Sequence, residues 1–173
     1  MADIARYPLT RHLRGSATAH VQHVRNGKAV HDGTGASFWF RPLSAVLSEI
    51  PVDDRELPLL FHARTADYQD LAVQTTLTFR FTDPTLAASR IDFSIDPETG
   101  RWRATPLDQV AGLLTESAQQ CAIDLLAATS LTDAVIAGVA PVRDAIATGL
   151  APDARPAETG IGVIGARVGA LRP

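Results

Sequence analysis

The sequence predicts an α+β fold, in which an antiparallel meander sheet is packed by two to four helices and closed by a C-terminal strand. Residues 71–82 alternate between apolar and more polar side chains, which is typical of a long strand with one buried face. Residues 105–129 place apolar side chains three and four positions apart, which indicates a helix that packs on the sheet. Most strands precede the helices, and the connections between strands are too short for parallel pairing.

The first half of the chain is predicted to be a series of strands joined by tight turns. Asn26-Gly27 indicates a two-residue hairpin turn, because both residues tolerate a positive φ. A second turn is expected at residues 32–35, and a charged connection at residues 52–56. The strands are expected at residues 17–25, 28–31, 37–40, 43–50, 57–65 and 71–82.

The second half contains the helices. Asp83 is placed to cap a helix that has Pro84 at its first position and ends near Arg90. Residues 91–95 alternate again, and Trp102 is expected to lie opposite them after a tight turn. Three more helices and a glycine-rich last strand are expected at residues 105–129, 130–137, 141–150 and 161–171.

Residues 1–15 look like a leader in front of a domain that covers residues 16–173. The leader carries four cationic or titratable positions, which are Arg6, Arg11, His12 and Arg14. We expect a solvated, partly ordered terminus. The alternative is a weak contact between these basic residues and anionic lipid or a partner. The contact would be weak because four cationic positions are at the lower end of what a lipid-binding basic cluster contains.

The composition favours a folded domain and argues against several classes of function. A hydrophobic fraction of 46% supports a core, and a net charge of -3 provides no basic field, so we expect no nucleic-acid partner. Cys121 is the only cysteine, so no internal disulfide forms and a cytoplasmic location is expected. The N-terminus lacks the apolar region of a secretory signal, and no apolar run is long enough to span a bilayer. Any membrane contact is therefore expected to be peripheral.

No set of residues in the sequence suggests a catalytic centre, a metal site or a cofactor site, so we expect a non-enzymatic protein. His20 and His23 are three positions apart in a predicted strand, so their side chains face opposite sides and do not readily hold one metal. Cys121 lies on the apolar face of a predicted helix, which is typical of a buried structural thiol. Gly160 and Gly162 lack the Lys-Ser/Thr pair and the following helix of a phosphate loop.

The aromatic segment Phe38-Trp39-Phe40 admits two interpretations. In the first, Phe38 and Phe40 face the core of the protein and Trp39 covers an edge. In the second, the segment and the neighbouring Arg41 enter the headgroup region of a membrane, where tryptophan is favoured. Phe38, Trp39, Phe40 and Arg41 are therefore the candidate residues for contact with a membrane or a partner.

The order and spacing of several motifs resemble the SPFH or band 7 domain family, which includes stomatin, prohibitin and flotillin-like proteins. The resemblance runs from about Val21 to Pro173. The motifs are Gly33-Thr34-Gly35, Phe38-Trp39-Phe40-Arg41-Pro42, Ile50-Pro51-Val52-Asp53-Asp54-Arg55, the strand ends Thr65, Asp67, Asp83 and Pro84, and Gly160-Ile161-Gly162-Val163. The chain departs from the family in having no N-terminal membrane anchor. It also stops at Pro173, where many members continue into a long coiled coil, so we expect a domain cut from a longer protein.

The resemblance implies a non-enzymatic scaffold or assembly domain without a cofactor. Such a domain is expected to form homo-oligomers in the full-length protein and to organise membrane or partner proteins, peripherally at the inner face of the plasma membrane. The alternative is a soluble assembly or cargo-binding module that resembles the vault shoulder domain and makes no membrane contact.

Overall fold

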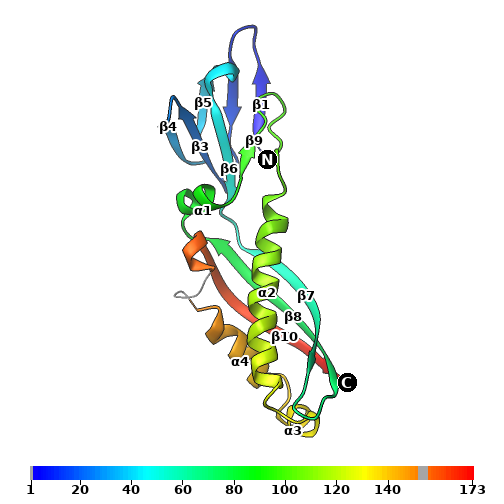
Figure 1. Ribbon diagram of the computed structural model, residues 1–173. Coiled ribbons are helices and arrows are strands. Elements are labelled where there is room, and N and C mark those ends of the chain that lie inside the picture. Colours follow the sequence, from blue (N-terminus) through cyan, green and yellow to red (C-terminus); the bar gives the residue numbers. More distant parts are fainter. Residues whose placement is uncertain (1, 152–155) are drawn as a thin grey trace. The chain divides into compact units, whose positions relative to one another are not determined.

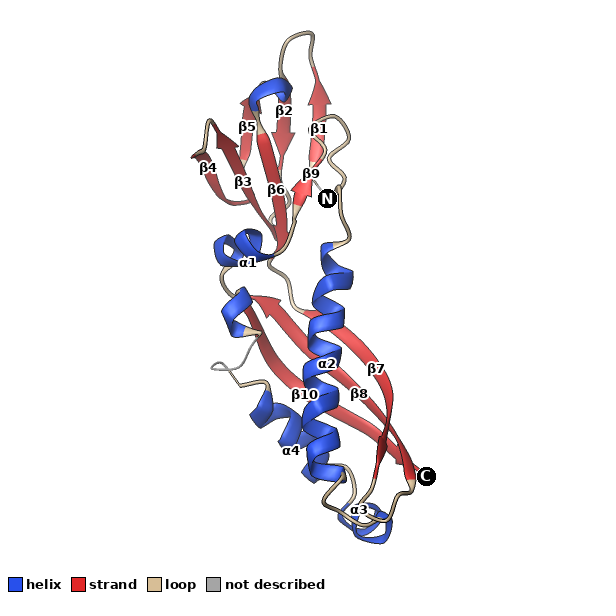
Figure 2. Cartoon of the chain, in the orientation of Figure 1, coloured by secondary structure: helices blue, strands red, loops and turns tan. Residues whose placement is uncertain are grey.

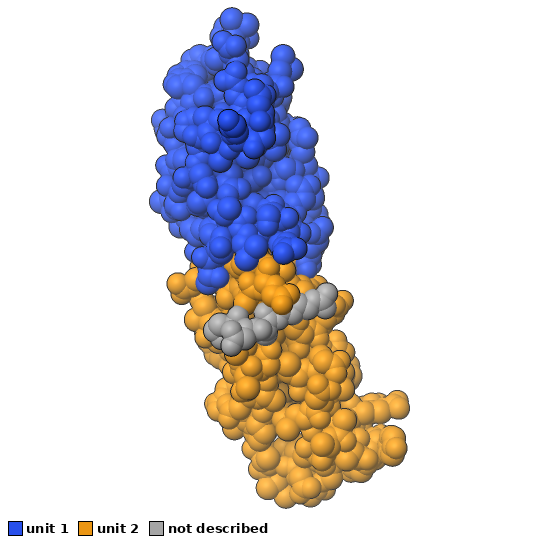
Figure 3. Space-filling model, turned by 60° about the vertical axis from the view of Figure 1, so that its left-hand side comes forward, with its two compact units in different colours: residues 1–53, 81–109 blue, residues 54–80, 110–173 orange. Residues whose placement is uncertain are grey.

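The computed structural model describes residues 2–151 and 156–173, and it confirms the predicted α+β class with antiparallel sheets and a C-terminal strand. The chain divides into two compact units (Figure 3). Unit 1 consists of residues 1–53 and 81–109, and unit 2 consists of residues 54–80 and 110–173. Each unit therefore joins two segments that are far apart in the sequence.

Unit 1 contains two antiparallel sheets around a small apolar core (Figure 1). The first sheet has the order β1-β2-β5, with strands Asp3–Arg6, Arg11–Arg14 and Ser37–Phe40. The second has the order β4-β3-β6-β9, with strands Lys28–Thr34, Ala19–Arg25, Val46–Pro51 and Ser94–Ile95. The buried core cluster comprises Ala2, Leu13, Val21, Phe38, Phe40, Leu47 and Ile95.

Residues 3–14 form two paired strands, which corrects the expectation of a partly ordered leader. Ile4 of β1 lies opposite Leu13 of β2, and the Leu13 side chain is fully buried. Arg11 donates hydrogen bonds to both carboxylate oxygens of Glu98, at 3.0 to 3.3 Å. Ile4 and Leu13 of this segment thus pack in the core of unit 1, whereas Tyr7 and Leu9, in the connection between the two strands, are exposed.

Several local predictions for unit 1 are confirmed. Asn26 and Gly27 turn between β3 and β4 with φ angles of 52° and 73°. The Asp83 carboxylate accepts a hydrogen bond from the Leu86 N–H at 2.9 Å and caps α1 (Pro84–Arg90). An isolated bridge joins Ile95 to Trp102, as expected.

Other boundaries differ from the predictions. β4 continues to Thr34, and β6 begins only at Val46, because Pro42–Ser44 form the short 3₁₀ helix η1. β3 pairs with β6, and β2 with β5, so the strands form three separate sheets instead of one continuous meander. These pairings join segments that are distant in the sequence, which is why turn signals alone did not predict them.

Unit 2 contains one sheet, whose strands are ordered β10-β8-β7 and whose helices are labelled in Figure 2. The strands are Ile161–Arg172, Asp70–Phe81 and Arg55–Arg64, and η2 (Ala157–Thr159) precedes β10. The helices are α2 (Pro106–Leu126), α3 (Leu131–Ala137) and α4 (Ala140–Gly149). Alternate residues of β7 and β8 are buried, as the period-2 pattern predicts. The buried residues of α2 lie four positions apart, at Val110, Leu114, Ala118, Ala122 and Leu126.

The turn between β7 and β8 is tied to the junction between α2 and α3. The Thr65 hydroxyl donates a hydrogen bond to the Asp67 carboxylate, which also accepts one from the Leu131 N–H at 3.0 Å. The Ala66 N–H donates to the Thr129 carbonyl at 2.9 Å. The hydrogen bond from Thr65 lowers the pKa of Asp67, and the bond from Leu131 contributes in the same direction. Thr65 and Asp67 therefore have a structural role in unit 2.

Cys121 of α2 lies against Gly149 of α4. A Cβ atom added at Gly149 would overlap the Cys121 Sγ atom. Burial raises the pKa of the half-buried thiol, and the charge of Asp124 contributes in the same direction. Both effects disfavour the nucleophilic thiolate.

We predict that Leu13→Ala destabilises the protein by about 2–5 kcal/mol, because the substitution leaves a cavity in the core of unit 1. The matched control is Leu9→Ala, since Leu9 is 85% exposed and its loss should change stability by less than about 0.5 kcal/mol. Urea unfolding measures both values. Equal stability of the two variants would contradict the placement of β2 in the core.

Gly149→Ala is expected to destabilise unit 2 by about 1–3 kcal/mol, because the new methyl group overlaps the Cys121 sulfur. In a Cys121→Ala background the same substitution should be neutral or stabilising, since alanine favours helix over glycine by about 1 kcal/mol. Thermal unfolding of the four proteins in this cycle measures the coupling. An equal effect of Gly149→Ala in both backgrounds would argue against this contact.

Candidate functional site

The structure separates the four residues of the predicted contact segment. Phe38 and Phe40 are 5% and 4% exposed and belong to the core of unit 1. Trp39 is 54% exposed, and Arg41 is also exposed. The alternation of side chains along β5 causes this division, because neighbouring residues of a strand point to opposite faces. Of the four candidates, only Trp39 and Arg41 are therefore available to a membrane or a partner.

The Trp39 ring is held at the surface by two neighbouring rings. The Tyr7 and His12 rings lie 4.7 and 4.8 Å from it, centre to centre, at tilted angles. His12 also contacts the Ser37 hydroxyl at 3.2 Å. These contacts come from β2 and from the connection between β1 and β2, so the segment predicted to be a leader positions Trp39.

Further apolar side chains of unit 1 are exposed around Arg25 and Arg41, which line the hollow of Trp39 as well. Leu9 is 85% exposed, and Leu43 of η1 is fully exposed. Both line a shallow hollow together with Arg25 and Arg41. We call the surface made by Tyr7, Leu9, Arg25, Trp39, Arg41 and Leu43 the tip surface. Sequence analysis missed Tyr7, Leu9 and Leu43, because single apolar residues in turns produce no periodic signal.

The two arginines of the tip surface have no carboxylate partner among the described residues, in contrast to several other arginines of the chain. Within the described residues, Arg25 and Arg41 form no hydrogen bond or ion pair through their side chains. Arg11, Arg64, Arg80, Arg143 and Arg167, in contrast, each contact a carboxylate. Residues 1–50 contain six Lys or Arg and three Asp or Glu, so this part of the sequence has a net positive charge. The whole chain is net negative, with 16 Lys or Arg and 19 Asp or Glu.

A second hollow adjoins the tip surface and contains a pair of histidines. Arg25, Trp39 and Arg41 line it together with His23, His31, Thr10, Val30, Phe40 and Ser44. The Nδ1 atoms of His23 and His31 are 3.1 Å apart. The Phe38 ring stacks on both imidazoles, at 5.2 Å from His23 and 4.3 Å from His31. The sequence did not predict this pair, because the pairing of β3 with β4 brings the two residues together.

The surroundings of His23 favour its neutral form. Burial lowers the pKa of His23, and the neighbouring His31 and Arg25 lower it further. One of the two facing Nδ1 atoms must carry a proton and the other must accept it, because two protonated rings would repel each other at this distance. In the structure, the buried Nε2 atom of His23 has no hydrogen-bond partner among the described residues.

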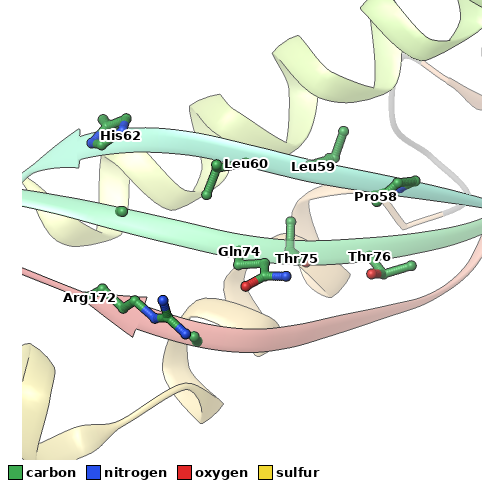
Figure 4. Close-up of a pocket in the computed structure, with 10 residues that line it drawn as sticks. Pro58, Leu59, Leu60, His62, Gln74, Thr75, Thr76 and Arg172 are labelled. Atoms are coloured by element: carbon green, nitrogen blue, oxygen red, sulfur yellow. The ribbon is translucent and has the colours of Figure 1, made fainter.

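Unit 2 carries another hollow, on the exposed face of its sheet. Figure 4 shows the lining residues, which include Pro58, Leu60, His62, Gln74, Thr76 and Arg172. Leu60 is 71% exposed. No acid, base and nucleophile come together among the residues that line this hollow. It can serve as a contact surface, but it offers no chemistry of its own.

Neither a metal site nor a single membrane-spanning helix occurs in the described part of the chain. Within residues 2–151 and 156–173, no three His, Cys, Asp or Glu side chains gather into a potential metal site. No single described helix is long and apolar enough to cross a bilayer. The helices α2 and α3 meet that criterion only when taken together, and the chain bends by 112° between them.

We predict that stability falls as the pH drops below about 6.5, the ordinary pKa of histidine. The pKa of His23 is lower in the folded protein, so between the two values the unfolded chain binds more protons and acid favours unfolding. His23→Leu should flatten the pH dependence of the thermal unfolding midpoint, whereas His62→Gln, at an exposed position, should leave it unchanged. A pH dependence that His23→Leu does not alter would refute the assignment.

Comparison with known sequences identifies no relative. No protein-family model matches the chain, and no curated protein shows significant similarity to it. The resemblance to the SPFH or band 7 family therefore stays a prediction from the sequence.

Proposed function

We propose that this chain is a non-enzymatic scaffold or assembly domain whose tip surface contacts an anionic membrane. One observation supports the membrane contact above all others: exposed aromatic and aliphatic side chains surround two arginines that have no partner among the described residues. An anionic lipid surface complements both properties at once, since it offers negative charge and an apolar interior.

Each part of the tip surface has a physical reason to favour a membrane. Leu9 and Leu43 expose almost their whole side chains, and each gains about 1.5–3 kcal/mol when transferred fully from water into an apolar phase. Trp39 and Tyr7 combine an apolar ring with a polar group, which suits the headgroup region. Arg25 and Arg41 attract anionic headgroups, with about 1 kcal/mol for each cation near the surface.

The assembly part of the proposal rests on the resemblance to the SPFH or band 7 family and on unit 2. Strands β7 and β10 are the two edges of its sheet, and edge strands can pair with another chain. We propose homo-oligomers of the full-length protein, peripheral at the cytoplasmic face of the plasma membrane, that organise membrane or partner proteins. The fold and the surface suggest no substrate.

Flotation with vesicles of phosphatidylcholine and phosphatidylserine tests the membrane contact. The intact chain should float, and the variant Trp39→Ala/Leu43→Ala should lose most of this binding because it removes apolar area from the tip surface. The matched control is Leu60→Ala/Tyr68→Ala, which removes residues of unit 2 that are 71% and 82% exposed. If both double variants still float, the proposed contact surface is wrong.

The soluble assembly or cargo-binding module is the second candidate. The observation in its favour is the exposed sheet face of unit 2, where Leu60 lies in a hollow between β7, β8 and β10. Sedimentation velocity over a range of concentrations measures self-association. An association that Leu60→Asp abolishes, together with no flotation of the intact chain, would favour this candidate over the membrane scaffold.

A further inference from the structure

We propose that the hollow between Arg25 and Arg41 binds a phosphate group, with the His23–His31 pair in its wall. This inference rests on the proposed membrane contact, because it names the headgroup chemistry that the tip surface would recognise. The same chemistry is also present in soluble phosphomonoesters. The experiment below distinguishes these two sources.

The two arginines supply the first part of the argument. Both residues line the two adjoining hollows of unit 1, so two cationic side chains belong to one region of the surface. No carboxylate occurs among the described residues that line either hollow. Elsewhere in unit 1, Glu98 is paired with Arg11 and Asp32 with His20. Two like charges in one hollow, without a counter-charge, favour an external anion.

The shape and hydrogen-bonding groups of the hollow favour phosphate among the possible anions. A guanidinium group presents its N–H donors in a planar fork that matches two phosphate oxygens. The side-chain hydroxyls of Thr10 and Ser44, in the same lining, add donors for further oxygens. A phosphomonoester carries close to two negative charges at neutral pH, which matches two arginines.

The histidine pair supplies the second, independent observation. His23 is only 4% exposed, and its Nε2 atom lacks a hydrogen-bond partner in the described part of the chain. Such a buried polar atom carries an energetic penalty. A bound anion would stabilise a protonated pair, because it offsets the positive charge of Arg25 that opposes protonation. Phosphate binding and proton uptake should therefore support each other.

The other elements around the pair do not oppose this coupling. The Phe38 and Phe40 rings of β5 contact the His23 ring. Leu47 of β6 is the residue paired with His23 in the strand register. These three side chains are apolar and do not titrate. The charged groups in the lining of the hollow are Arg25 and Arg41, and the titratable ones are the two histidines.

The tryptophans provide a direct reporter of occupancy. The chain has two tryptophans, and only Trp39 lines the proposed site. Trp102 is half-buried, and its indole N–H donates a hydrogen bond to the Glu49 carbonyl at 2.9 Å. Titration with inorganic phosphate should therefore move the indole N–H resonance of Trp39 in a ¹H–¹⁵N spectrum and leave that of Trp102 in place. Trp39→Phe assigns the two signals.

The variant Arg25→Gln/Arg41→Gln should weaken phosphate binding at least tenfold. The matched control, Arg14→Gln/Arg90→Gln, removes the same charge from exposed positions of unit 1 and should bind like the intact chain. Thermal unfolding verifies that both variants fold. As the pH falls, phosphate loses negative charge and should bind both proteins less tightly, but the intact chain should lose less affinity than His23→Leu, because only the intact chain can take up a proton at His23.

Vesicles identify the source of the phosphate. Preferential flotation with phosphatidic acid over phosphatidylserine, lost in Arg25→Gln/Arg41→Gln, supports a lipid headgroup in the hollow. A second outcome is a saturable shift of the Trp39 indole resonance with inorganic phosphate but no flotation with any vesicle. This outcome supports a phosphate site that binds a soluble phosphomonoester, and it overturns the membrane contact. Flotation on all anionic vesicles alike, without any shift of Trp39 by phosphate, overturns the site and leaves the membrane contact standing. Equal phosphate affinity of the two double variants also overturns the site.

Discussion

The burial of alternate β5 side chains in the core of unit 1 is the constraint on which the candidate site depends. Phe38 and Phe40 enter the core from one face of the strand, so Trp39 must emerge on the other face. Phe38 stacks on His23 and His31, which ties the second sheet to the first. The same packing therefore sets the position of the exposed tryptophan, of the histidine pair and of the hollow between them.

Unit 1 keeps exposed apolar side chains in water without losing its fold, because different residues provide stability and surface exposure. Leu13 and its neighbours in the core provide stability, while Leu9 and Leu43 lie in short connections that the core does not require. Arg25 and Arg41 surround the exposed apolar groups with charge, which limits self-association in water. The surface is thus available for binding at little cost to the fold.

In unit 2 the strand side chains also alternate between a buried and an exposed face, but here the exposed face of the sheet stays open. The buried residues of β8 and the stripe of α2 form its core. Polar contacts reinforce this arrangement at the turn end, where Asp67 accepts hydrogen bonds from Thr65 and Leu131. Thr65 and Asp67 are among the motifs of the family resemblance. Their contacts give them a role in packing the hairpin against the helices.

The α+β class, most helices and strands, the turn at Asn26-Gly27 and the cap at Asp83 could be predicted from the sequence alone, because periodicity and turn chemistry are local properties. It also placed Trp39 and Arg41 among the candidate contact residues. Three placements could be seen only in the three-dimensional structure: Leu13 is a core residue, His23 contacts His31, and Leu9 and Leu43 line one hollow with Arg25 and Arg41. These placements depend on pairings between distant strands, and such pairings are selected by the packing of the whole core and not by any local pattern.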